Sequence, residues 1–560
     1  MNRMKLHRMG ITILIGFMLL TGIYAVKYYR IVSTKGYHDI LLENCLIQID
    51  DIEENFGKLT ERIPEYNPGI YYMGTLLPYD KQNNRLYLPQ NYKETKWYGE
   101  LTAVIEGEVC PIYVLSDEMI EEKVRAIREG HDFILYVQIN DEEYYKVLLT
   151  ITGMPLISLN TEYEKEAEEI PYEVDPDKSI FGSETRYYGD FLMIDSGVRS
   201  GQYQITEAAL CYHYKGASTL GFEKKSYSID LLDYRGEKIN VSLAGMRSDS
   251  TWKLNALCTD KNLIREITAS QIWELFDEAN VDINEAGPNM EYVELIVDNE
   301  YRGVYCLVEP IDAKKMELQE DDVLYKVIDW QVPDAEDILG SVNMGWKVQY
   351  PIRIRYPKEI RDYRKAWYPM DDYLNLFHRG NEIEYDEAMK HINLDNFCDM
   401  FLFTMVVCGS DNAYKNTYYV AESNNGIENY QMKQIPWDLD YTFGNEYCFE
   451  SERNVAFKKD SYDKIYAEDA LIRLFGSNPE AIGDRLKEKW EEYRHSFLAT
   501  EYVINLMEEN IEYLLETGAF KREKERWPQS GADMDIEYLK DFQDTRMRWL
   551  DDYFEAWLKY

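Results

Sequence analysis

Two short segments in the C-terminal half carry oxygen-bearing side chains at spacings that suit phosphoryl transfer. Asp411 and Asn416 are five residues apart and follow the apolar run Met400–Val407, while Asp438 and Asp440 follow a second apolar stretch. A carboxylate five residues before an amide is the spacing of the base and the metal-binding asparagine in a kinase catalytic loop. Magnesium takes hard oxygen ligands and keeps positions for phosphate, so one or two carboxylates and an amide suffice. Asp side chains that cap ordinary turns would account for the same residues without any chemistry.

A loop with small residues lies between two strand-like runs nearer the middle of the chain. Gly216, Ser218 and Gly221 are spaced along it, and Lys224 and Lys225 follow at the start of the next strand. Such a loop can bring backbone N–H groups close to phosphate oxygens, and a lysine on the following strand can add positive charge. A hairpin turn followed by two solvated lysines is the alternative interpretation.

The element after this loop is a predicted helix over 262–278, with Asp260 or Asn262 as its N-cap. Arg265 and Glu266 fall in its first turns, where a charged side chain would either face a lysine of the preceding strand or be solvated. Glu309 ends a hairpin and leads out of the strand-rich half.

The pattern of apolar runs predicts an α+β chain with several domains. Short strands separated by turns, with one helix near 117–129, indicate a β-rich module over 40–165, best defined over 70–160. The acidic, proline-containing stretch 162–178 reads as a linker. Residues 178–312 are strand-rich and residues 313–560 are mostly helical.

The N-terminus has the pattern of a membrane-targeting segment. Basic residues precede an uncharged apolar run from Gly10 to Val26, and further basic residues follow it. Ile23 and Ala25 form a poor cleavage site, which favours an uncleaved transmembrane anchor over residues 1–30 rather than a signal peptide. We therefore expect a single-pass membrane protein with its C-terminal bulk outside the cytoplasm, and a secreted protein if the segment is cleaved.

The composition excludes some classes of function. The formal net charge of −41 opposes binding to DNA or RNA, because nucleic-acid affinity comes largely from neutralised phosphates. The eight cysteines are scattered singly and the seven histidines form no ligand motif, so no structural zinc site is indicated. Disulfides stay open, because their pairing cannot be read from these spacings.

Taken in order, these segments resemble the CotH family of spore-coat and secreted kinase-like proteins, from about residue 180 to the C-terminus. The matching stretches are 216–219 with 224–227, then 245–255, 263–265, 301–309, 411–416 and 436–440. The resemblance implies an atypical two-lobe protein-kinase fold, with an N-lobe over 178–312 and a C-lobe over 313–560. It also implies transfer of the γ-phosphoryl group of ATP to serine or threonine of a protein.

On the nucleotide side, the resemblance implies that Lys225 contacts the phosphates, with Lys224 the less favoured choice. The loop residues Gly216, Ser218 and Gly221 would lie close to the phosphates, and Glu309 would fall near the junction between the lobes.

For the chemical step, the resemblance implies that Asp411 is the catalytic base or orients the substrate. Asn416 and Asp438 would bind magnesium, with help from Asp440. The chain departs from the family pattern at two places: it reads Arg265-Glu266 where Arg-Asn is common, and Lys215 where an arginine is usual.

Two hypotheses of function follow. The first is an active, membrane-anchored kinase outside the cytoplasm, whose substrate is a protein such as a coat or envelope component. The second is a non-catalytic envelope or spore-coat protein, in which an inert kinase-like domain serves assembly or adhesion. The 48 tyrosines would suit a protein used for contacts.

Overall fold

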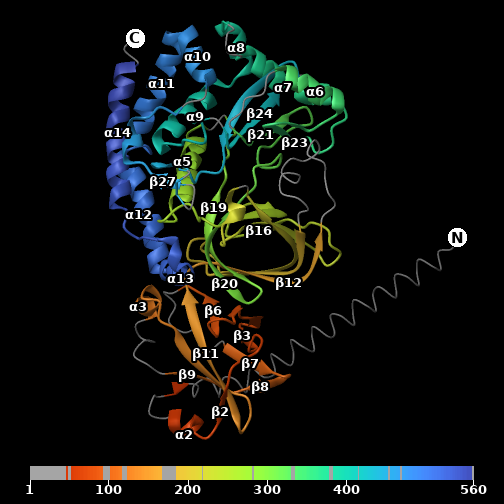
Figure 1. Cartoon of the computed structure of the whole chain (residues 1–560), viewed down its shortest axis with the longest axis vertical. Helices are drawn as coiled ribbons and strands as arrows, with labels where there is room; N and C mark the ends of the chain where they lie inside the picture. The colour runs from red at the N-terminus through yellow and green to blue at the C-terminus, as the bar shows by residue number, and fades with distance from the viewer. Residues whose placement is uncertain are drawn as a thin grey trace, which may run out of the picture. The chain divides into compact units, whose positions relative to one another are not determined.

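The computed structural model describes most of the chain after residue 45 (Figure 1). The described residues are 46–47, 52–91, 101–115, 123–166, 185–216, 218–280, 283–329, 335–377, 382–413, 415–424, 426–448, 450–451, 455–466 and 469–557. The predicted anchor at Gly10–Val26 lies outside these ranges. Within them, no helix combines the length and the apolar character needed to cross a bilayer. The chain divides into two compact units, residues 1–153 with 299–301, and residues 154–298 with 302–560.

The first unit is β-rich, as the alternating apolar pattern predicts. Its larger sheet has the strand order β1-β9-β10-β11-β6-β5, with β2 paired to β11, and its smaller sheet has the order β4-β3-β7-β8. The elements are β1 (Leu46–Ile47), α2 (Ile52–Phe56), β2 (Thr60–Arg62), β3 (Ile70–Tyr72), β4 (Thr75–Leu76), β5 (Tyr79–Asp80), β6 (Arg85–Pro89), β7 (Leu101–Ile105), β8 (Glu108–Cys110), β9 (Ile112–Leu115), α3 (Lys123–Arg128), β10 (Phe133–Gln138) and β11 (Glu143–Thr152).

The second unit begins with a closed β-barrel in the order β12-β13-β14-β15-β18-β20-β19. Its strands are β12 (Leu156–Glu166), β13 (Thr185–Asp195), β14 (Gln204–Lys215), β15 (Ser226–Leu232), β18 (Thr251–Asn255), β19 (Met290–Val297) and β20 (Glu300–Val308). Alternate apolar residues such as Ile157 and Leu159 fill its core. The linker predicted at 162–178 begins too early, because strand β12 continues to Glu166. Because β12 pairs with both β13 and β19, it belongs to this barrel and not to the β-rich module.

Two short elements lie beside the barrel strands. They are the 3₁₀ turn η4 (Ser218–Gly221) and the ribbon of β16 (Val241–Ser242) and β17 (Ser248–Asp249).

The C-terminal part is largely helical, as predicted, but it is built around a five-stranded sheet in the order β22-β23-β21-β24-β25. The strands are β21 (Val323–Val327), β22 (Val348–Gln349), β23 (Ile352–Tyr356), β24 (Thr417–Ser423) and β25 (Tyr430–Pro436), with β26 (Asn445–Tyr447) and β27 (Val455–Phe457) as a separate pair. The helices are α5 (Arg265–Ala279), α6 (Ala335–Met344), α7 (Tyr363–Leu376), α8 (Tyr385–His391), α9 (Leu394–Val407), α10 (Asp469–Ser477), α11 (Pro479–Arg494), α12 (Thr500–Glu516), α13 (Ala519–Arg526) and α14 (Glu537–Trp557), with short turns η5 (Lys459–Asp463) and η6 (Pro528–Ser530).

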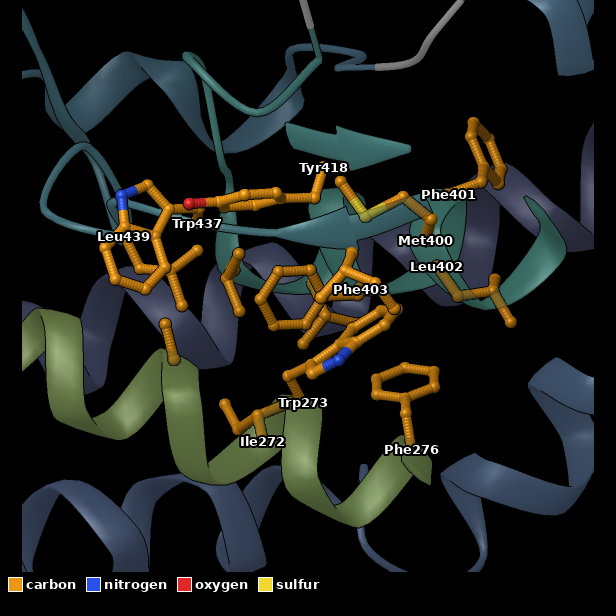
Figure 2. Close-up of a cluster of buried hydrophobic side chains, with 14 of the residues drawn as sticks. Ile272, Trp273, Phe276, Met400, Phe401, Leu402, Phe403, Tyr418, Trp437 and Leu439 are labelled. Atoms are coloured by element: carbon orange, nitrogen blue, oxygen red, sulfur yellow. The ribbon is translucent and has the colours of Figure 1, made fainter. Parts of the chain in front are cut away.

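Helices α5 and α9 meet in the main hydrophobic core (Figure 2). Trp273 and Phe276 of α5 face Phe403 of α9, and the rings of Trp273 and Phe403 are 5.1 Å apart edge to face. Edge-to-face aromatic pairs stabilise a core beyond their buried area. Helix α9 is mostly apolar and is buried over nearly its whole length, as expected for a helix inside a large core.

A buried polar network ties the ends of this core together. Lys489 of α11 donates to Asp399 of α9 over 2.7 Å, and Asn280, which follows α5, donates to Asp399 over 2.8 Å and to Glu285 over 3.3 Å. Burial, with Asp399 nearby, raises the pKa of Glu285 to about 8. The carboxyl group of Glu285 therefore retains its proton in the folded protein at neutral pH.

This raised pKa predicts that the free energy of unfolding of the second unit decreases as the pH rises from about 5 to about 8. In that range the folded protein holds a proton on Glu285 that the unfolded chain releases, so this group lowers the free energy of unfolding by at most about 1.4 kcal/mol per pH unit. Glu285→Gln should flatten that slope in urea unfolding followed at several pH values. Glu359→Gln, at an exposed position, is the matched control. An unchanged slope in Glu285→Gln would contradict the assignment.

Candidate functional site

The antiparallel pairing of β24 and β25 brings two of the predicted ligand residues together. Thr417 pairs with Pro436, and the N–H of Trp437 donates to the carbonyl of Asn416 over 2.8 Å. Asn416 therefore lies beside the segment that carries Asp438. Both residues have left-handed backbone conformations, with φ of 53° and 58°. Such conformations are uncommon outside glycine and often occur at functional sites, where the surrounding structure maintains them.

The turn after α9 places Asp411 against Asn416. Helix α9 ends at Cys408, which is left-handed, and the chain then folds back so that Asp411 is buried. One oxygen of Asp411 accepts from Lys415 Nζ over 2.9 Å and from Asn416 Nδ2 over 3.4 Å. Asn412 fixes the turn, because its Nδ2 donates to the carbonyls of Asn416 and Trp437.

Negative charge is concentrated around this turn. Burial raises the pKa of Asp440, and the carboxylates of Asp438, Glu266 and Asp411 raise it further. The hydroxyl of Thr259 donates to Asp440 over 3.0 Å. Burial also raises the pKa of Asp411, although Lys415 beside it acts in the opposite direction. The four carboxylates therefore share one region, and each makes ionisation of the others less favourable.

Helix α5 and the barrel strand β14 contribute the other charges near Asp438. Glu266 is buried in the first turn of α5 and accepts from Asn255 Nδ2, and its pKa is raised to about 7 by burial and by Asp438. Burial lowers the pKa of Lys215, while Asp438 and Glu266 act against this effect. Asp438 thus acts on both a helix glutamate and a lysine of β14. The expectation that a charged residue in the first turn of this helix faces a lysine of the preceding strand, β18, stays a prediction.

Lys224 and Lys225, predicted to contact phosphates, have other partners in the structure. Lys224 is buried, and its Nζ donates to Glu523 of α13 and to the carbonyl of Val304, each over 2.7 Å. Lys225 Nζ donates to the carbonyl of Leu220 within its own loop. These hydrogen bonds shape the loop before β15. The role of Lys225 as a phosphate contact stays a prediction.

The remaining predicted residues border this region. Gly216 has φ of 114°, a conformation that favours glycine, and η4 covers Ser218–Gly221. Glu309 is buried at the end of β20, where it accepts from the backbone N–H of Arg247 over 2.8 Å and from Lys315. The described contacts of Glu309 fix the segment that follows the barrel. They do not include the acidic cluster of Asp411, Asp438, Asp440 and Glu266.

The side-chain oxygens of Asp438, Asp440 and Asn416 would suit a hard cation that keeps part of its hydration shell. Asp438 is exposed and accepts no hydrogen bond from the described residues, so its carboxylate is available to a ligand. Across the part of the chain that the structure describes, no three Asp, Glu, His or Cys side chains are arranged to hold one ion. A site with Asp438, Asp440 and the amide oxygen of Asn416 would therefore rely on phosphate and water for its other ligands, as magnesium sites commonly do.

Several residues near the site were missed by sequence reasoning. They are Lys253 of β18, Thr259, Lys326 of β21, Arg355 of β23 and Asn412. Lys253 could have been found, because the alternation Trp252-Lys253-Leu254 in a strand places the lysine opposite the core. Lys326 and Arg355 gave no local signal, since they reach the site through pairings within the second sheet.

The fold and this geometry define an α+β protein whose C-terminal unit holds an acidic site suited to a metal and an anionic ligand. The model of the CotH kinase protein family matches residues 212–550, and the chain belongs to this family. The resemblance seen in the sequence is thereby confirmed. Comparison with curated proteins gave no match.

The hydrogen bonds of the two adjacent lysines predict different effects on stability. Lys224→Met leaves the buried carboxylate of Glu523 without its cation, which should lower the free energy of unfolding by about 3–5 kcal/mol. Lys225→Met breaks one hydrogen bond at a half-buried position and should lower it by about 1 kcal/mol or less. Chemical denaturation of both variants beside the wild type tests this difference. Equal losses of stability in the two variants would argue against the Lys224–Glu523 pair as a structural element.

Proposed function

We propose that this chain is a protein kinase of the CotH family, which transfers the γ-phosphoryl group of ATP to a serine or threonine hydroxyl with magnesium as cofactor. The observation that carries the proposal is the convergence of Asp411, Asn416 and Asp438 at one end of the β24–β25 pair. These are the residues for which the family resemblance implies catalysis and metal binding. The membership of residues 212–550 in the CotH kinase family supports the same conclusion.

In this proposal Asp411 orients the acceptor. Its second carboxylate oxygen accepts no hydrogen bond from the described residues, whereas the first is held by Lys415 and Asn416. The acceptor hydroxyl forms a new bond to the γ-phosphorus, and the bond between that phosphorus and the bridging oxygen breaks to release ADP. The hydroxyl proton passes to Asp411. The raised pKa of Asp411 favours its uptake of that proton.

The cofactor and the remaining side chains act on charge and position. Magnesium, when bound, neutralises the phosphate oxygens on which charge develops. In this proposal Asp438 and Asp440 hold the magnesium ion with Asn416, and the hydrogen bond from Thr259 orients Asp440. Phosphoryl transfer requires of the protein mainly positioning and electrostatic stabilisation, and the hydrogen bonds of Asn412 and Asn416 would supply the positioning of Asp411.

We also propose that the N-terminal apolar segment anchors the chain in a membrane with its bulk outside the cytoplasm. The support is the basic-flanked run Gly10–Val26. Under this proposal the physiological substrate is a protein of the envelope or coat.

The test is magnesium-dependent transfer of labelled phosphate from ATP by the purified full-length chain, to itself and to basic test proteins. Asp411→Asn should lower kcat by about 10²- to 10⁴-fold, because it removes the base and leaves the size of the side chain unchanged. Asp438→Asn should raise the magnesium concentration needed for half-maximal activity. Asp484→Asn, at an exposed position on α11, is the control and should retain wild-type activity.

Two results would overturn the proposal. One is the absence of transfer in the wild type when ATP with magnesium also fails to raise its melting temperature. The other is transfer that persists unchanged in Asp411→Asn and Asp438→Asn. The first result would favour the non-catalytic assembly or adhesion hypothesis.

A further inference from the structure

Four cationic side chains from four different strands lie near one another, and two of them, Lys215 and Lys326, lie beside the residue that precedes Asp438. Lys215 ends β14 and Lys253 lies in β18, both in the barrel, while Lys326 lies in β21 and Arg355 in β23, both in the five-stranded sheet. None of the four forms an ion pair with a carboxylate of the described residues. In a chain with a net charge of −41, such a group of cations without paired carboxylates is unexpected.

Trp437 links this group to the acidic cluster. The Nζ of Lys215 lies 5.8 Å from the centre of the Trp437 ring, and the Nζ of Lys326 lies 5.6 Å from it. Cations at this distance are attracted to the ring, so the indole holds two positive charges in place. Trp437 directly precedes Asp438, and the two cations therefore lie next to the proposed metal ligand.

A β-bulge explains the place of Arg355. Leu324 pairs with Tyr356 and Tyr325 pairs with Ile354, so Arg355 is the extra residue between two consecutive pairs. Bulges redirect a side chain and are frequent next to active sites. Arg355 is exposed, and no hydrogen bond or ion pair ties its guanidinium to the described residues.

Lys253 shows that the cations are close enough to affect one another. Its Nζ donates to the hydroxyl of Ser228, and its pKa is lowered to about 7 by burial and by the charges of Lys215, Arg355 and Lys326. The carboxylate of Asp230 acts in the opposite direction on Lys253, as Asp438 and Glu266 do on Lys215, but the repulsion among the four cations remains unfavourable. An anionic ligand with several negative charges would relieve this repulsion.

We infer that Lys215, Lys253, Lys326 and Arg355 bind the phosphate chain of the nucleoside polyphosphate, an inference that rests on the proposed function. Two cations come from the barrel and two from the second sheet, so a chain of phosphates contacts both, whereas a single phosphate reaches fewer of them. The position beside Asp438 lets the same phosphates complete the shell of the metal. Lys224 donates to Val304 and to Glu523 of α13, and Lys225 donates to Leu220. Under this inference, both lysines shape the neighbouring loop and do not contact the phosphates.

The test compares ligand binding by the full-length wild type and the double variant Lys326→Met/Arg355→Gln. The probes are ATP, AMP and inorganic tripolyphosphate, titrated by calorimetry and by thermal shift. In the wild type, ATP and tripolyphosphate should bind more tightly than AMP. The double variant should bind ATP and tripolyphosphate about 10- to 100-fold more weakly for each cation that is removed, and AMP should be affected less.

Two controls separate ligand binding from folding. Lys358→Met removes an exposed charge just after β23 and should bind all three probes like the wild type. The double variant without ligand should melt at the wild-type temperature or above it, because it removes like charges that repel one another. A purely structural role for these residues predicts a lower melting temperature instead.

The outcomes also distinguish this inference from the kinase proposal. If the wild type transfers phosphate and the double variant binds ATP and tripolyphosphate as tightly as the wild type, the inference is wrong and the kinase proposal stands. The inference would also be wrong, and the kinase proposal would stand, if Lys225→Met were the variant that lost binding of ATP and tripolyphosphate. If the probes bind the wild type but not the double variant while no transfer occurs, the inference stands and catalysis is refuted. Failure of the wild type to bind ATP or tripolyphosphate overturns the inference itself.

Discussion

The pairing of β24 with β25 is the constraint on which the site depends. It places Asn416 beside Trp437, and the side chain of Asn412 clamps the two segments through both of their backbone carbonyls. Trp437 and Leu439 are buried in the core shown in Figure 2, so Asp438 between them faces outward. The left-handed backbone at Asp438 persists because both of its neighbours are held by packing.

The electrostatics of the site divide into an acidic and a basic group, each of which opposes its own charge. Burial and mutual repulsion raise the pKa of Asp440, and the same effects lower the pKa of Lys253 to about 7. Under the proposed function, a metal ion would neutralise the acidic group and a phosphate chain would neutralise the basic group. Lys415 and Lys215 offset only part of the negative charge, and the charge that remains supports the proposal that the site binds a metal and a polyphosphate together.

Sequence reasoning found the acidic residues because their spacing is local. Asp411 and Asn416 lie five residues apart, and Asp438 and Asp440 follow a second apolar stretch with one residue between them. Lys326 and Arg355 were missed because a basic residue in a strand gives no sign of which neighbouring strand it meets. Arg355 depends on a bulge in a pairing with β21, and Lys224 on an ion pair with Glu523. Both β21 and Glu523 are distant in sequence from the residues they contact, so no local sequence pattern predicts these contacts.

The C-terminal helices explain why the family match extends so far beyond the turn at Asp411. Arg546 of α14 donates to the carbonyl of Met405, and Gln543 donates to that of Val406, so α14 satisfies carbonyls that end α9 just before Asp411. Glu523 of α13 holds the loop before β15 through Lys224. The match over 212–550 begins within β14 and ends within α14. It therefore includes Lys215 at the end of β14 and the helices that fix both the turn at Asp411 and the loop before β15.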